Sequence, residues 1–299
     1  MASPEPRLIH FTSSRRTTRA GFKRERVATG SEASYLSLPA MALYDTIGKG
    51  YGKTRAPDPR ISGKLMAMLD LPPGATVLDV GAGTGKYARV LAEHGYSVWA
   101  LEPSEVMQAQ SIPHERVRFL QASAEAIPLP DGAVEGTMVV LALHHFRDRR
   151  AAFQEILRVT GGGPVVMFTF DPLAFGKFWL AEYFPGIGRR FGASAAALAN
   201  VAAEFQELTE RRVTTIPFPL PRDLQDRFGA TAWGQPEAYL DAKVRNGISD
   251  FALMEAAEVA NGLDRLQADL KSGQWDERHG ALRTQETHEV GYRFIVVER

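Results

Sequence analysis

From residue 76 onward, the chain alternates short apolar runs with segments in which apolar residues recur every three or four positions. Runs typical of buried strands stand at VLDV (77–80), SVWALE (97–102), VRFLQA (117–122), GTMVVLAL (136–143) and PVVMFTF (164–170). Helical patterns separate these runs. Strands that alternate with crossover helices in this way predict a doubly wound α/β sheet with parallel strands.

Capping residues mark the helices between these strands. We expect a first helix over roughly 85–94, which Gly95 ends, and a second helix that opens at Pro103-Ser104. The segment DRRAAFQEILRV (148–159) predicts an amphipathic helix, whose apolar face is made of Ala152, Phe153, Ile156, Leu157 and Val159. Glycines at 161–163 stop this helix.

The alternation ends after Asp171. The next residues, to position 210, are rich in aromatic side chains and then in alanine, which predicts an inserted helical cap. Strand patterns return at RRVTTIPFPL (211–220) and GYRFIVVE (291–298), with a mainly helical connection over 222–290. The connection between these two strands lacks the clear crossover pattern that joins parallel strands. We therefore predict a Rossmann-like sheet of seven strands, mostly parallel, with the last strand antiparallel.

The N-terminal segment differs from the rest in composition. Seven Lys or Arg and two acids lie between Met1 and Gly30, among many Ser and Thr. We interpret it as a disordered basic tail; an organelle transit peptide, or a natural start at Met41, remains open. The expected parts are therefore a tail (1–40), N-terminal lid helices (41–75), a core (76–171), a cap (172–210) and a completion of the sheet with its helical connection (211–299).

Composition limits the function classes. The 35 basic and 35 acidic residues balance, so we do not expect nucleic acid as a partner. The chain has no cysteine, which excludes disulfides, thiolate metal sites and cysteine nucleophiles. No apolar run approaches the ~20 residues of a membrane-spanning helix. We expect a cytoplasmic protein that acts as a monomer or homodimer.

The segment DVGAGTG (79–85) places three glycines at alternate positions between a predicted strand and a predicted helix. A dinucleotide fingerprint that starts at Gly81 needs Gly or Ala where Lys86 stands. A Walker phosphate loop needs Ser or Thr after that lysine, but Tyr87 follows. Asp79 also makes a bound pyrophosphate unfavourable. Cofactors held by their phosphates therefore fit this loop poorly.

An acidic residue at the end of the second predicted strand favours another kind of cofactor. Glu102 lies 21 residues past Gly81, where a carboxylate accepts hydrogen bonds from both hydroxyls of a ribose. Asp79 suits a nearby ammonium or sulfonium group. The two acids indicate a cofactor that joins an adenosine to a cationic amino-acid end.

Several segments have the order and spacing of known motifs. They include VLDVGAGTG (77–85), WALEPS (99–104), QASAEAIPLPDGAVE (121–135), VVLALHHF, EILRVTGGGPVVMF and the early YDTIGKGY. Together they resemble the class I S-adenosylmethionine (SAM) dependent methyltransferases, in the small-molecule branch similar to the ubiquinone/menaquinone-biosynthesis enzymes. The resemblance implies SAM as cofactor, bound by Asp79, Gly81, Ala82, Gly83, Gly85, Glu102, Pro103, Ser123, Ala124 and Leu141.

The segment LYDTIGKGYGKTR (43–55) precedes the first strand and has two interpretations. It is either a surface helix packed on the sheet or a lid over the cofactor. As a lid, it would bring Arg55 to the cofactor's carboxylate and a ring of Tyr44 or Tyr51 against the sulfonium.

The candidates for catalysis and acceptor binding lie in the loops beyond the strands. His144 and His145 are the first candidates for a general base, although a capping or packing role is the alternative. They lack a third ligand, so we expect no metal site. An apolar acceptor pocket is expected from the aromatic residues Phe175, Trp179 and Tyr183, which equally suit the core of a cap. Trp233 follows a predicted strand end and is a further candidate for this pocket, with a solvated loop as the alternative.

These observations lead to one main hypothesis about function. The chain transfers a methyl group from SAM to oxygen, nitrogen or carbon of a small, partly apolar acceptor. Two alternatives remain open. One is a SAM-binding regulatory or assembly protein without catalysis, and the other is an NAD-dependent oxidoreductase, which Lys86 and Asp79 disfavour.

Overall fold

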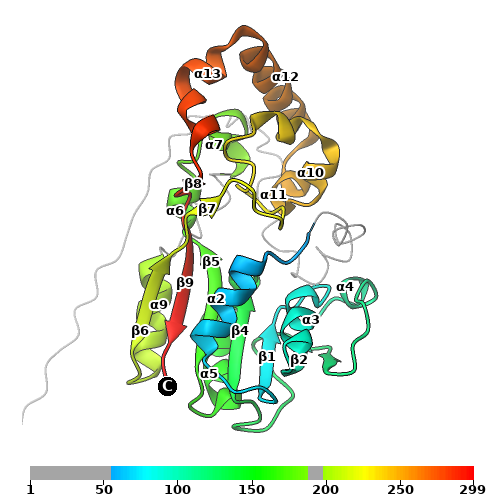
Figure 1. Cartoon of the computed structure of the whole chain (residues 1–299), viewed down its shortest axis with the longest axis vertical. Coiled ribbons are helices and arrows are strands. Elements are labelled where there is room, and N and C mark those ends of the chain that lie inside the picture. Colours follow the sequence, from blue (N-terminus) through cyan, green and yellow to red (C-terminus); the bar gives the residue numbers. More distant parts are fainter. Residues whose placement is uncertain (1–54, 188–197) are drawn as a thin grey trace, which may run out of the picture. The chain divides into compact units, whose positions relative to one another are not determined.

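A seven-stranded sheet forms the centre of the protein in a computed structural model that describes residues 55–187 and 198–299. The described residues belong to one compact unit, Leu38–Arg299. The sheet has the order β3-β2-β1-β4-β5-β9-β6 (Figure 1). Its strands are β1 (Thr76–Val80), β2 (Ser97–Leu101), β3 (Val117–Leu120), β4 (Gly136–Val140), β5 (Val165–Phe170), β6 (Val213–Pro217) and β9 (Tyr292–Val297).

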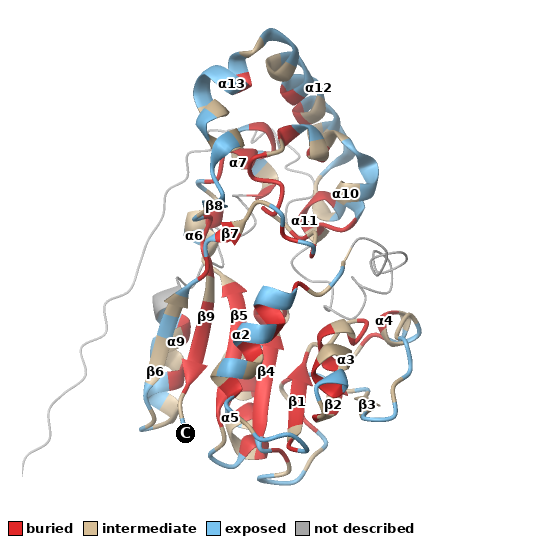
Figure 2. Ribbon diagram, viewed as in Figure 1, coloured by how far each residue is buried: buried red, intermediate tan, exposed pale blue. Residues whose placement is uncertain are grey.

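The pairing of the strands confirms the predicted topology. Strands β1 to β5 pair in parallel, and β9 lies antiparallel between β5 and β6. The sheet is therefore mostly parallel, and its last strand along the chain is the antiparallel one. Figure 2 shows that most of the central strands are buried, as expected for a sheet covered by helices on both faces.

The helices that flank the core follow the capping signals in the sequence. They are α2 (Pro59–Leu69), α3 (Lys86–Glu93), α4 (Glu105–Gln108) and α5 (Arg149–Thr160). The side chain of Asp148 caps α5 by accepting from the amide of Ala151, and Gly161 ends it with a left-handed backbone. The helix α2 packs against β4 and β5, with Ile61 and Leu65 fully buried.

The helix α9 (Leu198–Leu208) changes the expected limits of the cap. It packs on α5 and β6, where the ring of Phe205 stacks on that of Phe153 with 3.8 Å between their centroids. Since β5 and β6 run in the same direction, the chain between them needs a crossover, and α9 covers the sheet as that crossover. The cap predicted at 172–210 therefore does not extend over α9, and residues 188–197 lie outside the described ranges.

The cap is built mainly from the segment that was expected to be a connection. Short helices α6 (Pro172–Phe175) and α7 (Leu180–Tyr183) join η3 (Pro236–Leu240), α10 (Ala242–Asn246), α11 (Ser249–Leu253), α12 (Ala256–Ser272), α13 (Gln274–His279) and η4 (Gly280–Thr284). Strands β7 (Leu220–Pro221) and β8 (Thr287–His288) pair in a separate small sheet. Trp179 and Trp275 pack edge to face inside the cap, with 5.3 Å between ring centroids.

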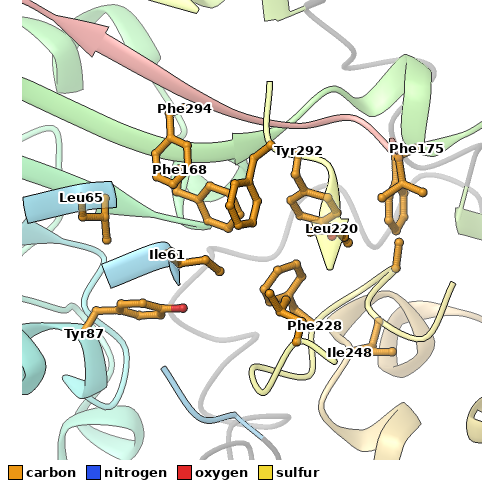
Figure 3. Packing of buried hydrophobic residues seen from close by; sticks show 14 of the residues in the cluster. Ile61, Leu65, Tyr87, Phe168, Phe175, Leu220, Phe228, Ile248, Tyr292 and Phe294 are labelled. Atoms are coloured by element: carbon orange, nitrogen blue, oxygen red, sulfur yellow. The ribbon is translucent and has the colours of Figure 1, made fainter. Parts of the chain in front are cut away.

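The sheet and the cap share one continuous hydrophobic core. Phe168 of β5 packs on Phe294 of β9, and the same cluster continues through Tyr292 to Phe175 and Ile248 of the cap. Figure 3 shows these side chains in the core. The cap is thus held to the end of the sheet by buried apolar contacts rather than by a polar hinge.

Gly262 tests how tightly α12 packs on the cap. A Cβ atom on Gly262 would lie 2.4 Å from Cε1 of Phe184 and 2.6 Å from the Tyr183 carbonyl oxygen. We expect Gly262→Ala to lower the free energy of unfolding by about 1–3 kcal/mol, because neither neighbour moves easily. The control Gly63→Ala, which meets nothing within 4 Å on α2, is expected to raise it by about 0.5–1 kcal/mol. Urea unfolding measures both, and a neutral Gly262→Ala would contradict the packing described.

Candidate functional site

The glycine turn after β1 is tied to the end of β2. The amides of Gly81 and Ala82 both donate to the carbonyl of Leu101, at 2.8 and 3.0 Å. Gly81 has φ +72°, and a Cβ atom there would lie 2.4 Å from Cβ of Ala142 beyond β4. A side chain at this position would therefore both strain the backbone and clash with the neighbouring loop.

Glu102 lies just beyond β2 with its carboxylate held by backbone amides. Its Oε2 accepts from the amide of Gly83 at 2.8 Å, and its Oε1 accepts from the amide of Ser104 at 2.9 Å. The hydroxyl of Ser104 in turn caps α4 by accepting from the Met107 amide. These contacts fix the carboxylate of Glu102 between the glycine turn and the start of α4.

Asp79 is a second buried acid beside the turn. Its side chain is 2% exposed, and its Oδ1 has no hydrogen-bond partner in the part of the chain that the structure describes. Burial and the charge of Glu102 raise the pKa of Asp79 to about 7, although the Ala88 amide opposes the shift. A cation or hydrogen-bond donor placed next to Oδ1 would favour the ionised form.

These groups face one cavity of about 390 Å³ at the carboxyl ends of β1, β2 and β4. Leu141 lines it with φ +53°, a left-handed backbone that is strained in a leucine. Of the residues expected to bind a cofactor, the cavity is lined by Arg55, Asp79, Gly81, Ala82, Gly83, Glu102, Pro103, Ser123, Ala124 and Leu141.

Gly85 does not line the cavity. It precedes α3 with φ +71°, and a Cβ atom there would lie 2.6 Å from Cζ of Phe119. The third glycine is thus required by a left-handed backbone and by close packing on β3. Tyr44 and Tyr51, the other expected cofactor residues, lie outside the described ranges.

Arg55 lines the cavity but is bound to an acid of the chain. Its Nε and Nη2 both donate to the carboxylate of Asp226, which is 1% exposed. The hydroxyl of Tyr87 donates to the same carboxylate at 3.0 Å, and Nζ of Lys86 donates to the Arg55 carbonyl. These contacts join the segment before α2, the start of α3 and the loop after β7 into one wall of the cavity.

The two histidines face different cavities. They lie in η2 (Leu143–His145), directly after β4, with 3.9 Å between their ring centroids. His145 lines the large cavity, whereas His144 lines a second cavity of about 40 Å³. The described residues contain no group of three or more His, Asp or Glu that is placed to hold a metal ion.

The residues expected to form the acceptor pocket separate into two groups. Phe175 lines the small cavity. Trp179, Tyr183 and Trp233 line neither of these two cavities, and each is buried with a hydrogen bond inside the cap. Trp179 donates to the carbonyl of Trp233, Trp233 to that of Leu220, and Tyr183 to Asp269. A cap made of short helices needs these large rings as its core.

The cavities include residues that sequence reasoning did not assign to a site. The large cavity adds Lys86 and Tyr87, which directly follow the glycine turn, so their place in the motif could have identified them. The small cavity adds Phe170, Phe228, Ile248, Asp250 and Tyr292. These come from segments far apart in the sequence, and no local pattern joins them.

In the described part of the chain, no helix is long and apolar enough to cross a membrane.

Comparisons with known proteins match one segment of the chain and, for a solved structure, most of the chain. Residues 78–168 match the family model described as a methyltransferase domain. A crystal structure of a protein from Anabaena variabilis, provisionally named a methyltransferase of an antibiotic biosynthesis pathway, is 42% identical, with a TM-score of 0.78. That match covers 82% of this chain and 99% of the other.

Curated relatives match less than half of this chain. A demethylmenaquinone methyltransferase of Renibacterium salmoninarum is 30% identical over 44% of this chain, and a malonyl-[acyl-carrier protein] O-methyltransferase of Serratia marcescens is 34% identical over 36% of it. The chain spans 58% and 42% of the lengths of these two relatives. With its glycine turn, buried acids and strand order, the chain belongs to the class I SAM-dependent methyltransferase family.

Proposed function

We propose that the protein transfers a methyl group from SAM to a small-molecule acceptor. The large cavity at the carboxyl ends of β1, β2 and β4 would hold SAM, in the crevice where ligands bind in open α/β sheets. Its volume of about 390 Å³ lies within the usual range for cofactor and ligand pockets.

The orientation of Glu102 is the observation that carries the proposal. Two backbone amides, from Gly83 and Ser104, hold its carboxylate at the edge of the cavity. A carboxylate fixed in this way accepts hydrogen bonds from the two hydroxyls of an adenosine ribose without reorganising. Ser123 and Ala124 line the same cavity and would lie against the adenine.

Asp79 supports the other end of the same cofactor. Its buried Oδ1 lacks a partner among the described residues, and the amino group of SAM would supply a positively charged donor there. Arg55 is a weaker candidate for the cofactor's carboxylate, since two of its nitrogens are bound to Asp226.

Buried Asp79 beside the glycine turn argues against NAD, because the cofactor's pyrophosphate would approach its carboxyl group in a site of low polarity. A binding protein without catalysis would need only the large cavity. The small aromatic cavity that shares Leu141 and Arg55 with it favours an enzyme, since an acceptor needs its own place. Catalysis would then rest on positioning the two substrates and on excluding water.

Calorimetric titration of the full chain with S-adenosylhomocysteine, and separately with NAD, tests this proposal. We expect binding of S-adenosylhomocysteine in the micromolar range and no binding of NAD. Binding of NAD alone would overturn the cofactor assignment. Methyl transfer would then be followed with radiolabelled SAM over a panel of small acceptors.

Replacement of Glu102 tests the assigned ribose contact. In Glu102→Gln an amide NH₂ replaces one oxygen, so that it faces a backbone amide and no longer accepts from a hydroxyl. We expect the affinity for S-adenosylhomocysteine to fall roughly 30- to 100-fold. The control Glu105→Gln changes an exposed acid in the first turn of α4 and should leave the affinity unchanged. An unchanged affinity in Glu102→Gln would contradict the assignment.

The pKa of Asp79, about 7, predicts a pH dependence of binding. The ionised form binds a cationic amino group more strongly, so the affinity for S-adenosylhomocysteine should rise about tenfold from pH 6 to pH 8. Asp79→Asn should bind more weakly at pH 8 and lose most of this dependence. Calorimetry at several pH values measures both effects.

The raised pKa of Asp79 also affects the stability of the ligand-free protein. Whereas ligand affinity should rise with pH, the contribution of Asp79 to stability should fall. The folded-state pKa lies above the ordinary value of 3.8, so the folded state holds the proton more tightly and the contribution of Asp79 to stability falls as pH rises from about 4 to 7. Asp79→Asn should therefore unfold at a higher temperature than the wild type at pH 8. A lower unfolding temperature would contradict the buried, unpartnered carboxylate.

A further inference from the structure

The connection between β3 and β4 forms one edge of the large cavity. This β3–β4 loop, residues 121–135, lies wholly within the described ranges and contains no helix or strand. Its residues 122–125 line the cavity, where the proposed function places the adenine. Because the loop has no ladder of backbone hydrogen bonds of its own, its position depends on what other elements offer to its backbone groups.

Two charged side chains of α5 hold the middle of this loop. Glu155 and Arg158 form a bidentate ion pair, with Nε donating to Oε1 at 2.7 Å and Nη2 to Oε2 at 2.8 Å. The same Oε2 accepts from the amide of Ile127 at 2.9 Å, and the same Nη2 donates to the Ile127 carbonyl at 3.0 Å. The pair thus satisfies both backbone groups of Ile127, as a neighbouring strand would do.

Arg158 extends the contact further along the loop. Its Nη1 donates to the carbonyl of Leu129 at 2.7 Å and to the carboxylate of Asp131 at 2.9 Å. The hydrogen bonds from Arg158 hold the pKa of Glu155 below its usual value, although burial opposes this shift. The pair is therefore charged at neutral pH. Neither Glu155 nor Arg158 lines the large cavity.

Apolar packing joins the same loop to the same helix. The side chain of Ile127 is 3% exposed, in one buried cluster with Phe153 and Ile156 of α5. Glu125, which lines the cavity, accepts from the amide of Arg147 at 2.8 Å, just before α5. The stretch that forms the cavity wall therefore ends directly beside residues that α5 holds in place, and a shift of Ile127 would move that wall.

We propose that Glu155 and Arg158 are positioning residues for the base of the cofactor, and that by holding the β3–β4 loop they set how strongly the protein prefers adenine to another purine. The proposal rests on the proposed function and adds to it two residues outside the cavity. A site distinguishes two bases by hydrogen bonds at the edge of the ring, and such contacts weaken sharply when the binding groups are misplaced. A pair with a structural role alone would change the stability and leave the preference between bases unaltered.

Two ligands that differ only in the base test the proposal on the full chain. In S-inosylhomocysteine an oxygen replaces the amino group of the adenine in S-adenosylhomocysteine, and the adjacent ring nitrogen carries a hydrogen. We expect calorimetry of the wild type to show that S-adenosylhomocysteine binds at least about tenfold more tightly. Equal binding of the two ligands would overturn the proposal, because the protein would then have no preference for Arg158 to set.

Replacement of Arg158 tests the positioning role itself. In Arg158→Ala the carbonyls of Ile127 and Leu129 lose their donor, so we expect the preference for adenine to fall to within about threefold, through weaker binding of S-adenosylhomocysteine. The control Arg150→Ala removes an arginine of the same helix that pairs with the exposed Glu207 at 3.5 Å, and it should keep the wild-type preference. A full preference in a folded Arg158→Ala protein would overturn the role, even if that protein unfolds at a lower temperature.

A milder variant covers the case in which Arg158→Ala does not fold. Arg158→Lys keeps the positive charge but replaces the planar fork with one ammonium group, which reaches fewer of the acceptors on the loop. We expect a preference for adenine between those of the wild type and the alanine variant. An unchanged preference in Arg158→Lys would then overturn the proposal.

The binding of S-adenosylhomocysteine separates this proposal from the one on which it rests. A wild-type chain that binds neither ligand would refute the proposed function. A wild-type chain that prefers S-adenosylhomocysteine, with the same preference in the folded variants of Arg158, would refute only the positioning role.

Discussion

The reversal of strand order between β1 and β4 is the constraint on which the rest of the site depends. The strands β2 and β3 extend the sheet in one direction from β1, and β5, β9 and β6 extend it in the other from β4. The connections therefore leave the carboxyl ends of β1 and β4 in opposite directions and open a crevice between them. The acids Asp79 and Glu102, and the strained backbone of Leu141, all stand at that edge.

The site places two carboxylates where a stable fold alone would favour apolar groups. Asp79 and Glu102 are both buried, and the charge of Glu102 makes ionisation of Asp79 less favourable. Glu102 is compensated by two backbone amides, whereas Asp79 Oδ1 has no partner among the described residues. This difference assigns the two acids different tasks. Glu102 is oriented by the chain itself, and under the proposed function Asp79 would gain its partner from the bound cofactor.

The sequence predicts the first half of the site much better than the second. The glycine turn, Glu102 and the strand ends follow one another at fixed spacings, so local patterns predict both the fold and most of the residues named here that line the large cavity. The small cavity is lined by Phe170, Asp250 and Tyr292, which lie far apart in the sequence. Only the folded chain brings these residues together. The packing of α9 is another feature that only the folded chain defines. The alanine-rich pattern before residue 210 predicts a helix, but not that α9 packs on α5 instead of on the cap.

The position of β9 has a consequence for the order of assembly during synthesis. This strand follows all others along the chain, yet it pairs with β5 on one side and β6 on the other. While a ribosome is still making residues 218–291, the edge of β5 and the strand β6 have no neighbour to join them. An exposed edge of that kind is a template for unwanted pairing with other chains. We therefore expect the nascent protein to depend on holding chaperones until β9 is available to close the sheet.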